Sequence, residues 1–191
     1  MLEQEIKSYL TTHKEPFKDQ TKSHTDVDFF LPRNGVYLDA KEKRQRFDMR
    51  NWKEAIMPEE CLFIIDDLAI RKLLRHAPHS FCLIRDCSRS PQTYYVYSIV
   101  DFLCMPKKRC RRPIRRNVPA YKGKWLLDLR DAAAFEKLED AMKYVIGYKN
   151  KHPAIFETHI DCWGKYPSEH IKEGGSTRKA KHWDEDAKAH T

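Results

Sequence analysis

Several signatures of common enzyme and membrane-protein classes are missing from this sequence of 191 residues. Only six glycines are present, and none lies in a GxxxxGK[ST] or GxGxxG pattern, which argues against the usual nucleotide-binding loops. No stretch approaches the roughly 20 apolar residues of a membrane-spanning helix. The N-terminus is charged and amphipathic, unlike a signal peptide. We therefore expect a cytoplasmic protein that does not associate with membranes.

The six cysteines include no CxxC pair, the tight spacing from which structural zinc sites are usually built. They stand at irregular intervals inside apolar segments or beside basic ones, as expected for buried or free thiols in a reducing compartment. A zinc site is the less favoured alternative. It would use Cys82, Cys87, Cys104 and Cys110.

Positive charge is concentrated in one segment. The chain has a formal net charge of +8, and residues 107–116, KKRCRRPIRR, carry seven positive charges and no negative one. Such a block repels itself, so its presence indicates a polyanionic partner, with a solvated loop as the alternative. The residues expected to contact nucleic acid here are Lys107, Lys108, Arg109, Arg111, Arg112, Arg115 and Arg116.

Apolar periodicity predicts a mixed set of helices and strands. Helices are expected over residues 1–12, 68–76 and 132–148, the last capped by Asp131. Strands are expected over residues 26–31, 36–43, 80–86, 93–104 and 124–129, with the basic block as a long loop before the last. This order favours an α/β fold, with α+β as the alternative, in which helices flank a mixed sheet.

The domain limits follow from where this pattern weakens. Residues 1–150 are expected to form the folded domain, followed by a C-terminal extension over residues 151–171. Residues 172–191 are polar, contain glycine and have mixed charge, which is typical of a disordered tail.

The first two predicted strands form a hairpin whose alternation determines which side chains share a face. A turn at Arg33-Asn34 places Asp28 opposite Asp39, whereas a turn one residue later places Asp28 opposite Lys41. Both registers give the same two faces. The charged face has Asp26, Asp28, Asp39, Lys41 and Lys43, and the apolar face has Val27, Phe29, Leu31, Val36, Leu38 and Ala40.

Two carboxylates on paired strands repel each other, which is unfavourable unless a cation lies between them. Mg²⁺ prefers one or two carboxylates together with water and phosphate oxygens. Lys41, two residues after Asp39 on the same face, would reach the same ligand and stabilise charge on a phosphate or orient a water. The alternative is a solvated polar face with a cross-strand ion pair.

Asp28, followed after ten residues by Asp39-Ala40-Lys41, resembles the motif of the PD-(D/E)xK nuclease superfamily. This superfamily includes Holliday-junction-resolvase-like and restriction-endonuclease-like enzymes. The resemblance implies that Asp28, Asp39 and the backbone carbonyl of Ala40 hold Mg²⁺, for which Mn²⁺ substitutes. It also implies that Lys41 assists the hydrolytic water.

The same resemblance implies a restriction-endonuclease-like core, a further glutamate ligand from the first helix, and a homodimer. Glu5 is the first candidate for that ligand and Glu3 the second. The sequence departs from the motif in having Val27 where proline is usual and Asp39 where glutamate is commoner.

Three cations come after the hairpin motif: Lys43, Arg44 and Arg46. They are expected to contact a phosphate backbone, with a solvent-exposed strand end as the alternative. Together with the motif they favour a Mg²⁺-dependent endo- or exodeoxyribonuclease that acts on DNA rather than RNA. The alternative is a non-catalytic nucleic-acid-binding module of a larger complex, whose binding would depend on salt and not on Mg²⁺.

Overall fold

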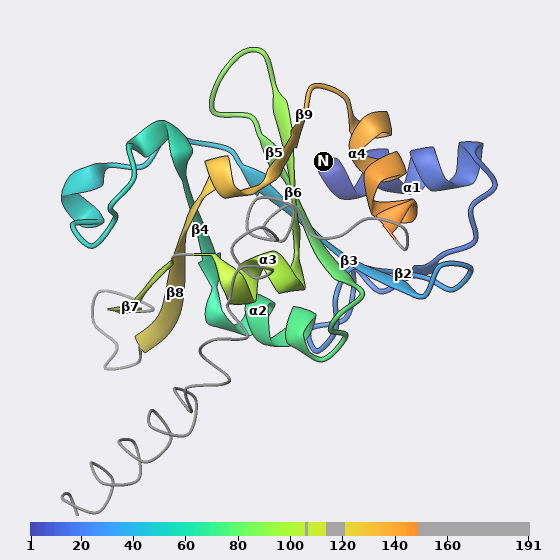
Figure 1. Ribbon diagram of the computed structural model, residues 1–191, viewed down its shortest axis with the longest axis horizontal. Coiled ribbons are helices and arrows are strands. Elements are labelled where there is room, and N and C mark those ends of the chain that lie inside the picture. The colour runs from blue at the N-terminus through green and yellow to red at the C-terminus, as the bar shows by residue number, and fades with distance from the viewer. Residues whose placement is uncertain (106, 114–120, 149–191) are drawn as a thin grey trace, which may run out of the picture. The chain divides into compact units, whose positions relative to one another are not determined.

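Two β-sheets with helices on both sides of the larger one make up the part of the chain that the computed structural model describes, residues 1–105, 107–113 and 121–148 (Figure 1). The mixture confirms the α/β prediction. The predicted extension over residues 151–171, the predicted tail over 172–191, and both Arg115 and Arg116 lie outside the described residues.

The larger sheet is mixed, as predicted. Its strand order is β1-β2-β3-β5-β6-β9, and only the β3–β5 pair is parallel among its described strands. The strands are β1 (Lys18–Asp19), β2 (Phe29–Leu31), β3 (Val36–Lys43), β5 (Ser80–Asp86), β6 (Thr93–Ser98) and β9 (Ala133–Phe135). Because parallel neighbours need a long crossover, the chain leaves the sheet after β3 and returns at β5.

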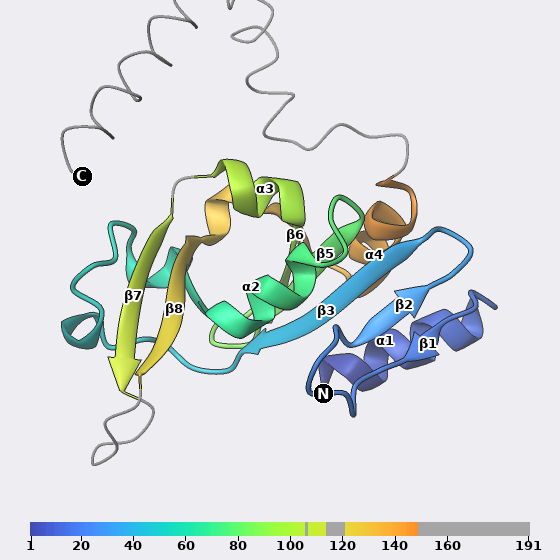
Figure 2. The same ribbon diagram turned by 90° about the horizontal axis from the view of Figure 1, so that it is seen from below.

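The crossover contributes to a second sheet, which is antiparallel and has the order β4-β8-β7 (Figure 2). Its strands are β4 (Leu62–Asp66), β8 (Tyr121–Asp128) and β7 (Lys108–Pro113). The crossover also holds two short 3-10 turns, Met49–Asn51 and Glu59–Cys61, and helix α2 (Asp67–Leu74). This arrangement places β4 and α2 beside the polar face of β3.

The helices divide between the two faces of the larger sheet (Figures 1 and 2). Helices α1 (Leu2–Thr12) and α4 (Leu138–Ile146) cover the apolar face of the hairpin, and Leu2, Ile6 and Leu10 of α1 are buried there. Helices α2 and α3 (Ile99–Cys104) lie on the other face. None of the helices within the described ranges has the length and apolar character to span a bilayer.

The predicted strand over residues 93–104 is wrong in its second half. β6 ends at Ser98, and α3 begins at the next residue. Ser98 and Asp101 form a capping box, in which the Ser98 hydroxyl accepts from the Asp101 amide (3.1 Å) and the Asp101 carboxylate accepts from the Ser98 amide (2.8 Å). This local cap overrides the β-propensity of the apolar residues that follow.

The predicted helix over residues 132–148 begins later than expected. Asp131 lies in a 3-10 turn, the next residues form β9, and α4 begins at Leu138 after Lys137 as its N-cap. β9 pairs antiparallel with β6, with Tyr94 opposite Phe135. Backbone hydrogen bonds to the open edge of β6 therefore override the helical pattern of residues 132–135.

The described part of the basic block, residues 107–113, contains a strand where a loop was predicted. This strand, β7, pairs along its length with β8, and Cys110 is buried beside Leu126 while Arg109 and Arg111 are exposed. A period of two is therefore present in the block, although its charge conceals it. The prediction also missed β4, a short apolar run that comes directly before α2.

An ionic network ties α1 to the end of β3. The Glu42 carboxylate accepts from the Leu2 amide (2.9 Å) and from Arg44 (2.7 Å), and Arg85 bridges Glu42 to Glu5. Burial alone would raise the pKa of Glu42, but these hydrogen bonds lower it to about 2. The network therefore favours a charged Glu42 in the folded protein.

Replacing Glu42 by glutamine should lower the free energy of unfolding by about 2 kcal/mol at neutral pH. Because the folded-state pKa lies below the ordinary value of 4.5, the contribution is complete above pH 4.5 and is lost as the pH falls towards 2. Urea unfolding across this range should show the two proteins converging. Glu139→Gln, on the surface of α4, serves as the control, and a deficit for Glu42→Gln that persists at pH 2 would contradict the argument.

Candidate active site

The register of the hairpin places Asp28 opposite Asp39, one position beyond the last paired residues of β2 and β3. The facing pairs are Phe29 with Leu38, Phe30 with Tyr37, and Leu31 with Val36, which is the register with the turn at Arg33-Asn34. Asp28 is the residue before β2, and Asp39 follows Leu38, the last residue of β3 that pairs with β2. The apolar face is buried as expected, including Val27 and Ala40.

Two carboxylates and a backbone carbonyl surround the Lys41 ammonium. The Lys41 Nζ lies 2.5 Å from Asp39 Oδ2 and 3.7 Å from Asp28 Oδ2, and it donates to the Ala40 carbonyl at 3.1 Å. Asp28 Oδ2 also accepts from the Ala40 amide at 2.8 Å, which fixes its carboxylate against β3 beyond the last residue paired with β2. These oxygens converge on one cation position.

The electrostatics of this cluster depend on burial. Asp39 is only 2% exposed, and this burial raises the pKa of its carboxyl to about 6, with a smaller contribution from the Asp28 charge and an opposing one from Lys41. Burial disfavours the Lys41 ammonium, but the Asp39 and Asp28 charges outweigh that effect and raise the pKa of Lys41. Lys41 is therefore protonated at neutral pH and balances a buried negative charge.

The donor set suits a hard divalent cation. Carboxylate and carbonyl oxygens are ligands that Mg²⁺ prefers, and the position of the Lys41 ammonium marks a point where positive charge is accommodated. Asp39 Oδ2 has the Lys41 ammonium as its ionic partner 2.5 Å away, so a divalent ion at this position would compete with Lys41 for it. No group of three or more His, Cys, Asp or Glu side chains in the described ranges is arranged to hold a metal. Mg²⁺ here would need Asp28, Asp39, the Ala40 carbonyl, and water or phosphate oxygens.

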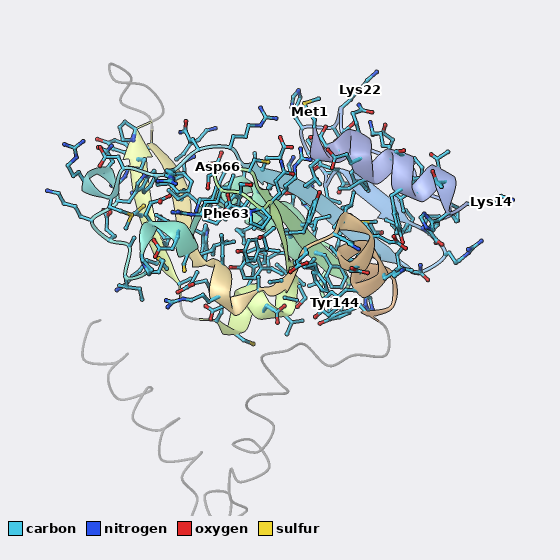
Figure 3. All side chains as sticks on the ribbon, turned by 90° about the horizontal axis from the view of Figure 1, so that it is seen from above. Met1, Lys14, Lys22, Phe63, Asp66 and Tyr144 are labelled. Atoms are coloured by element: carbon cyan, nitrogen blue, oxygen red, sulfur yellow. The ribbon has the colours of Figure 1, made fainter. Side chains whose placement is uncertain are left out.

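The cluster opens into a cleft of about 610 Å³ between β3, α2 and β4. Figure 3 shows Phe63 and Asp66, which line it from β4. Lys72 of α2 and Lys124 of β8 bring positive charge to its walls, and Lys124 forms an ion pair with Asp66. The cleft therefore combines an anionic floor with cationic sides, an arrangement that can hold a phosphodiester against a metal ion.

Lys72 and Lys124 were not predicted as site residues. Lys72 is close enough to Asp39 for its charge to lower the pKa of that carboxyl. The signal in the sequence is its position, because Lys72 stands three residues after the buried Ala69 and so borders the apolar stripe of α2. Lys124 has no comparable local signal, since its place in the cleft depends on the pairing of β8 with β4.

Comparisons with family models, with curated proteins and with solved structures find no match for this chain. The role of the cleft must therefore be inferred from its own residues. The likeness of the Asp28, Asp39 and Lys41 pattern to the PD-(D/E)xK motif stays a prediction from sequence.

The two candidate glutamates of α1 lie apart from the cleft. Glu5 forms an ion pair with Arg85, which also contacts Glu42. Side chains alternate along β3, so Glu42 and Arg85 lie on the face opposite Asp39, and Glu5 does not join the predicted metal ligands. Glu3 does not line the cleft but lines a separate groove of about 370 Å³, to which Ala40 and Lys41 also contribute.

The cations after the motif have different environments. Lys43, predicted to contact phosphate, is 1% exposed and donates to the backbone carbonyls of Glu59 (3.1 Å) and Glu60 (3.0 Å). It fixes the turn that precedes β4 and is not accessible to a phosphate backbone, which corrects the prediction. Arg44 and Arg46 are exposed, as that role requires.

The described part of the basic block presents its charges in two ways. Lys108, Arg109 and Arg111 are exposed, with Arg109 3.2 Å from the Asp67 carboxylate. Arg112 is held by Glu54 at 2.6 Å, and Lys107 donates to backbone carbonyls near the end of α3. Exposed cations therefore lie between two anchored ones, Lys107 and Arg112, on this edge of the second sheet.

The four cysteines of the alternative zinc site are not brought together. Cys82 is buried in β5 on the face of Asp39, whereas Cys110 is buried in the second sheet. Cys104 is exposed at the end of α3, and Cys87 follows β5. All four are free thiols in the structure, and the zinc alternative finds no support in it.

Proposed function

We propose that this protein is a cytoplasmic, metal-dependent nuclease that hydrolyses phosphodiester bonds of DNA. The observation that carries the proposal is the convergence of Asp28, Asp39 and the Ala40 carbonyl on one point, held in the structure by the Lys41 ammonium, inside a cleft with cationic walls. Such an arrangement suits the stabilisation of a phosphate whose charge increases in the transition state.

In this proposal Asp28, Asp39 and the Ala40 carbonyl hold Mg²⁺, or Mn²⁺ in its place. A bound divalent ion supplies Lewis-acid polarisation of the phosphate and a more acidic water. With a metal ion on the two carboxylates, the Lys41 ammonium would be free to donate to a phosphate oxygen or to orient the attacking water. Lys72 and Lys124 would balance the charge of the bound strand.

Incubating the purified full-length chain with supercoiled plasmid and with a short single-stranded DNA tests the proposal. With Mg²⁺ or Mn²⁺ we expect nicked, linear or shortened products, and with EDTA we expect intact substrate. Cutting at an equal rate in EDTA would rule out the metal, and intact DNA under every condition would contradict the proposed hydrolysis.

A non-catalytic nucleic-acid-binding module is the second candidate, either as a homodimer or in a larger complex. Two observations favour it: Lys41 already balances both carboxylates, and β7 presents exposed cations apart from the cleft. Binding would then weaken steeply as salt rises, would not respond to Mg²⁺, and would occur without cleavage.

A further inference from the structure

The cleft does not end at its cationic walls but continues over the second sheet. A second groove of about 480 Å³ shares three lining residues with it, namely Phe47, Ile64 and Lys124. From there the groove passes Trp52 and reaches Arg112 and Pro113 at the edge of the sheet. The two hollows therefore form one track that leads away from Asp28 and Asp39.

The walls of this second groove are aromatic. Phe47 and Trp52 lie in the segment between β3 and β4 and pack edge to face, with ring centroids 6.4 Å apart and an interplanar angle of 75°. Both rings are only partly buried, as is Ile64 beside them. A groove that presents partly open aromatic rings offers flat apolar surface to a ligand with flat apolar faces.

Positive charge accompanies these rings at fixed positions. The Arg112 guanidinium lies 4.9 Å from the centre of the Trp52 ring and is held there by Glu54 (2.6 Å) and by the Asn51 carbonyl (2.8 Å). Lys124 is held at the junction of the two hollows by Asp66. The cations are thus positioned in advance, which reduces the entropy lost when an anion binds.

Nucleic acids combine flat apolar faces with regularly spaced anions, and only an unpaired strand exposes both. In a duplex the bases are stacked inside and hidden from a protein groove, whereas in a single strand they can stack on aromatic side chains. A duplex therefore has no exposed base face to stack on the aromatic walls. The exposed cations of β7 would contact it only through its phosphate backbone.

We propose that this second groove binds an unpaired nucleic-acid strand that leaves the cleft, with bases against Phe47 and Trp52 and phosphates near Arg112 and Lys124. The inference rests on the proposed function, since it takes the strand in the cleft to be the substrate. It makes the preferred substrate a DNA with a single-stranded segment next to the point of cleavage.

Binding measured in EDTA tests the groove without requiring cleavage. Fluorescence anisotropy would compare a labelled single-stranded oligonucleotide with a blunt hairpin of equal length. For Trp52→Ala we expect about tenfold weaker binding of the single strand, consistent with the loss of one stacked base, and an unchanged affinity for the hairpin. Trp52→Phe, which keeps a flat ring, should restore most of the loss.

Arg112→Gln provides a second test that leaves the aromatic rings in place. It should weaken single-strand binding about threefold to tenfold, whereas Arg33→Gln at the hairpin turn should have no effect. Equal losses for single strand and hairpin, or full single-strand affinity in both Trp52→Ala and Arg112→Gln, would overturn the inference.

The two proposals fail in different ways. If the protein cuts duplex DNA in a metal-dependent way and Trp52→Ala binds single strands normally, the proposed nuclease function stands and the proposed role of the groove is wrong. If the protein never cuts DNA and Trp52→Ala selectively loses single-strand binding, the proposed role of the groove stands and the proposed nuclease function is wrong.

Discussion

Replacing Asp39 by asparagine should reduce the rate of DNA cleavage by about 1,000-fold, equivalent to roughly 4 kcal/mol of transition-state stabilisation. The amide keeps the size of the side chain but loses the charge that would hold a divalent ion beside Asp28. The fold should tolerate the change, because burial already disfavours the Asp39 carboxylate and Lys41 keeps the Asp28 charge nearby.

The matched control for this variant is Asp26→Asn. Asp26 lies on the same face of the hairpin, but its carboxylate contacts His76 at 2.7 Å and does not line the cleft. Initial rates of plasmid nicking in Mg²⁺, with thermal unfolding measured on the same samples, separate chemistry from stability. If Asp39→Asn cuts at the wild-type rate, or if Asp26→Asn loses as much activity, the assignment of the site to Asp39 is wrong.

The hairpin could be predicted because all its determinants are local. Asp28, Asp39 and Lys41 lie within 14 residues, and a period of two assigns them to one face in either register. The apolar residues of the opposite face, from Phe29 to Ala40, are then buried by α1 and α4 without any need to know where those helices begin and end.

The surroundings of the hairpin motif depend on contacts between distant segments and could not be predicted from local pattern. The basic strand β7 is stabilised by β8, and β9 forms because the edge of β6 accepts it. Lys43 continues the charged face of the hairpin in sequence, yet the crossover folds over it and buries it. A local pattern assigns a side chain to a face but does not say what covers that face.

Contacts between distant segments also explain why Glu5 was wrongly expected as a metal ligand and why Lys72 and Lys124 were not predicted. Glu5 stands on α1 where a metal ligand was expected, but Arg85 from β5 captures it on the far side of the sheet. Lys72 and Lys124 reach the cleft from α2 and β8, which are more than 30 residues away from Asp39 in sequence. The charge balance of the cleft is therefore a property of the fold and not of the motif.

Replacing Lys41 by methionine should separate metal binding from cleavage. In the structure the Lys41 ammonium lies against Asp39 and the Ala40 carbonyl, so it competes with a divalent ion for the same oxygens. We expect Lys41→Met to bind Mn²⁺ about tenfold more tightly, a gain of roughly 1.4 kcal/mol. We expect its rate of cleavage to fall about 100-fold, because the group that orients the water or stabilises the phosphate is lost.

Titration calorimetry with Mn²⁺ on EDTA-treated protein, together with plasmid nicking at saturating Mn²⁺, would measure the two effects separately. Lys18→Met, which removes a lysine of the neighbouring strand β1 that lies over the Phe30 ring, is the control. Asp39→Asn should lose both metal binding and cleavage, so opposite changes in the two measurements distinguish the lysine from the acid. Weaker Mn²⁺ binding by Lys41→Met would mean that the ammonium positions the carboxylates instead of competing for them. An unchanged rate at saturating Mn²⁺ would remove Lys41 from the chemistry and leave the two aspartates as the reactive group.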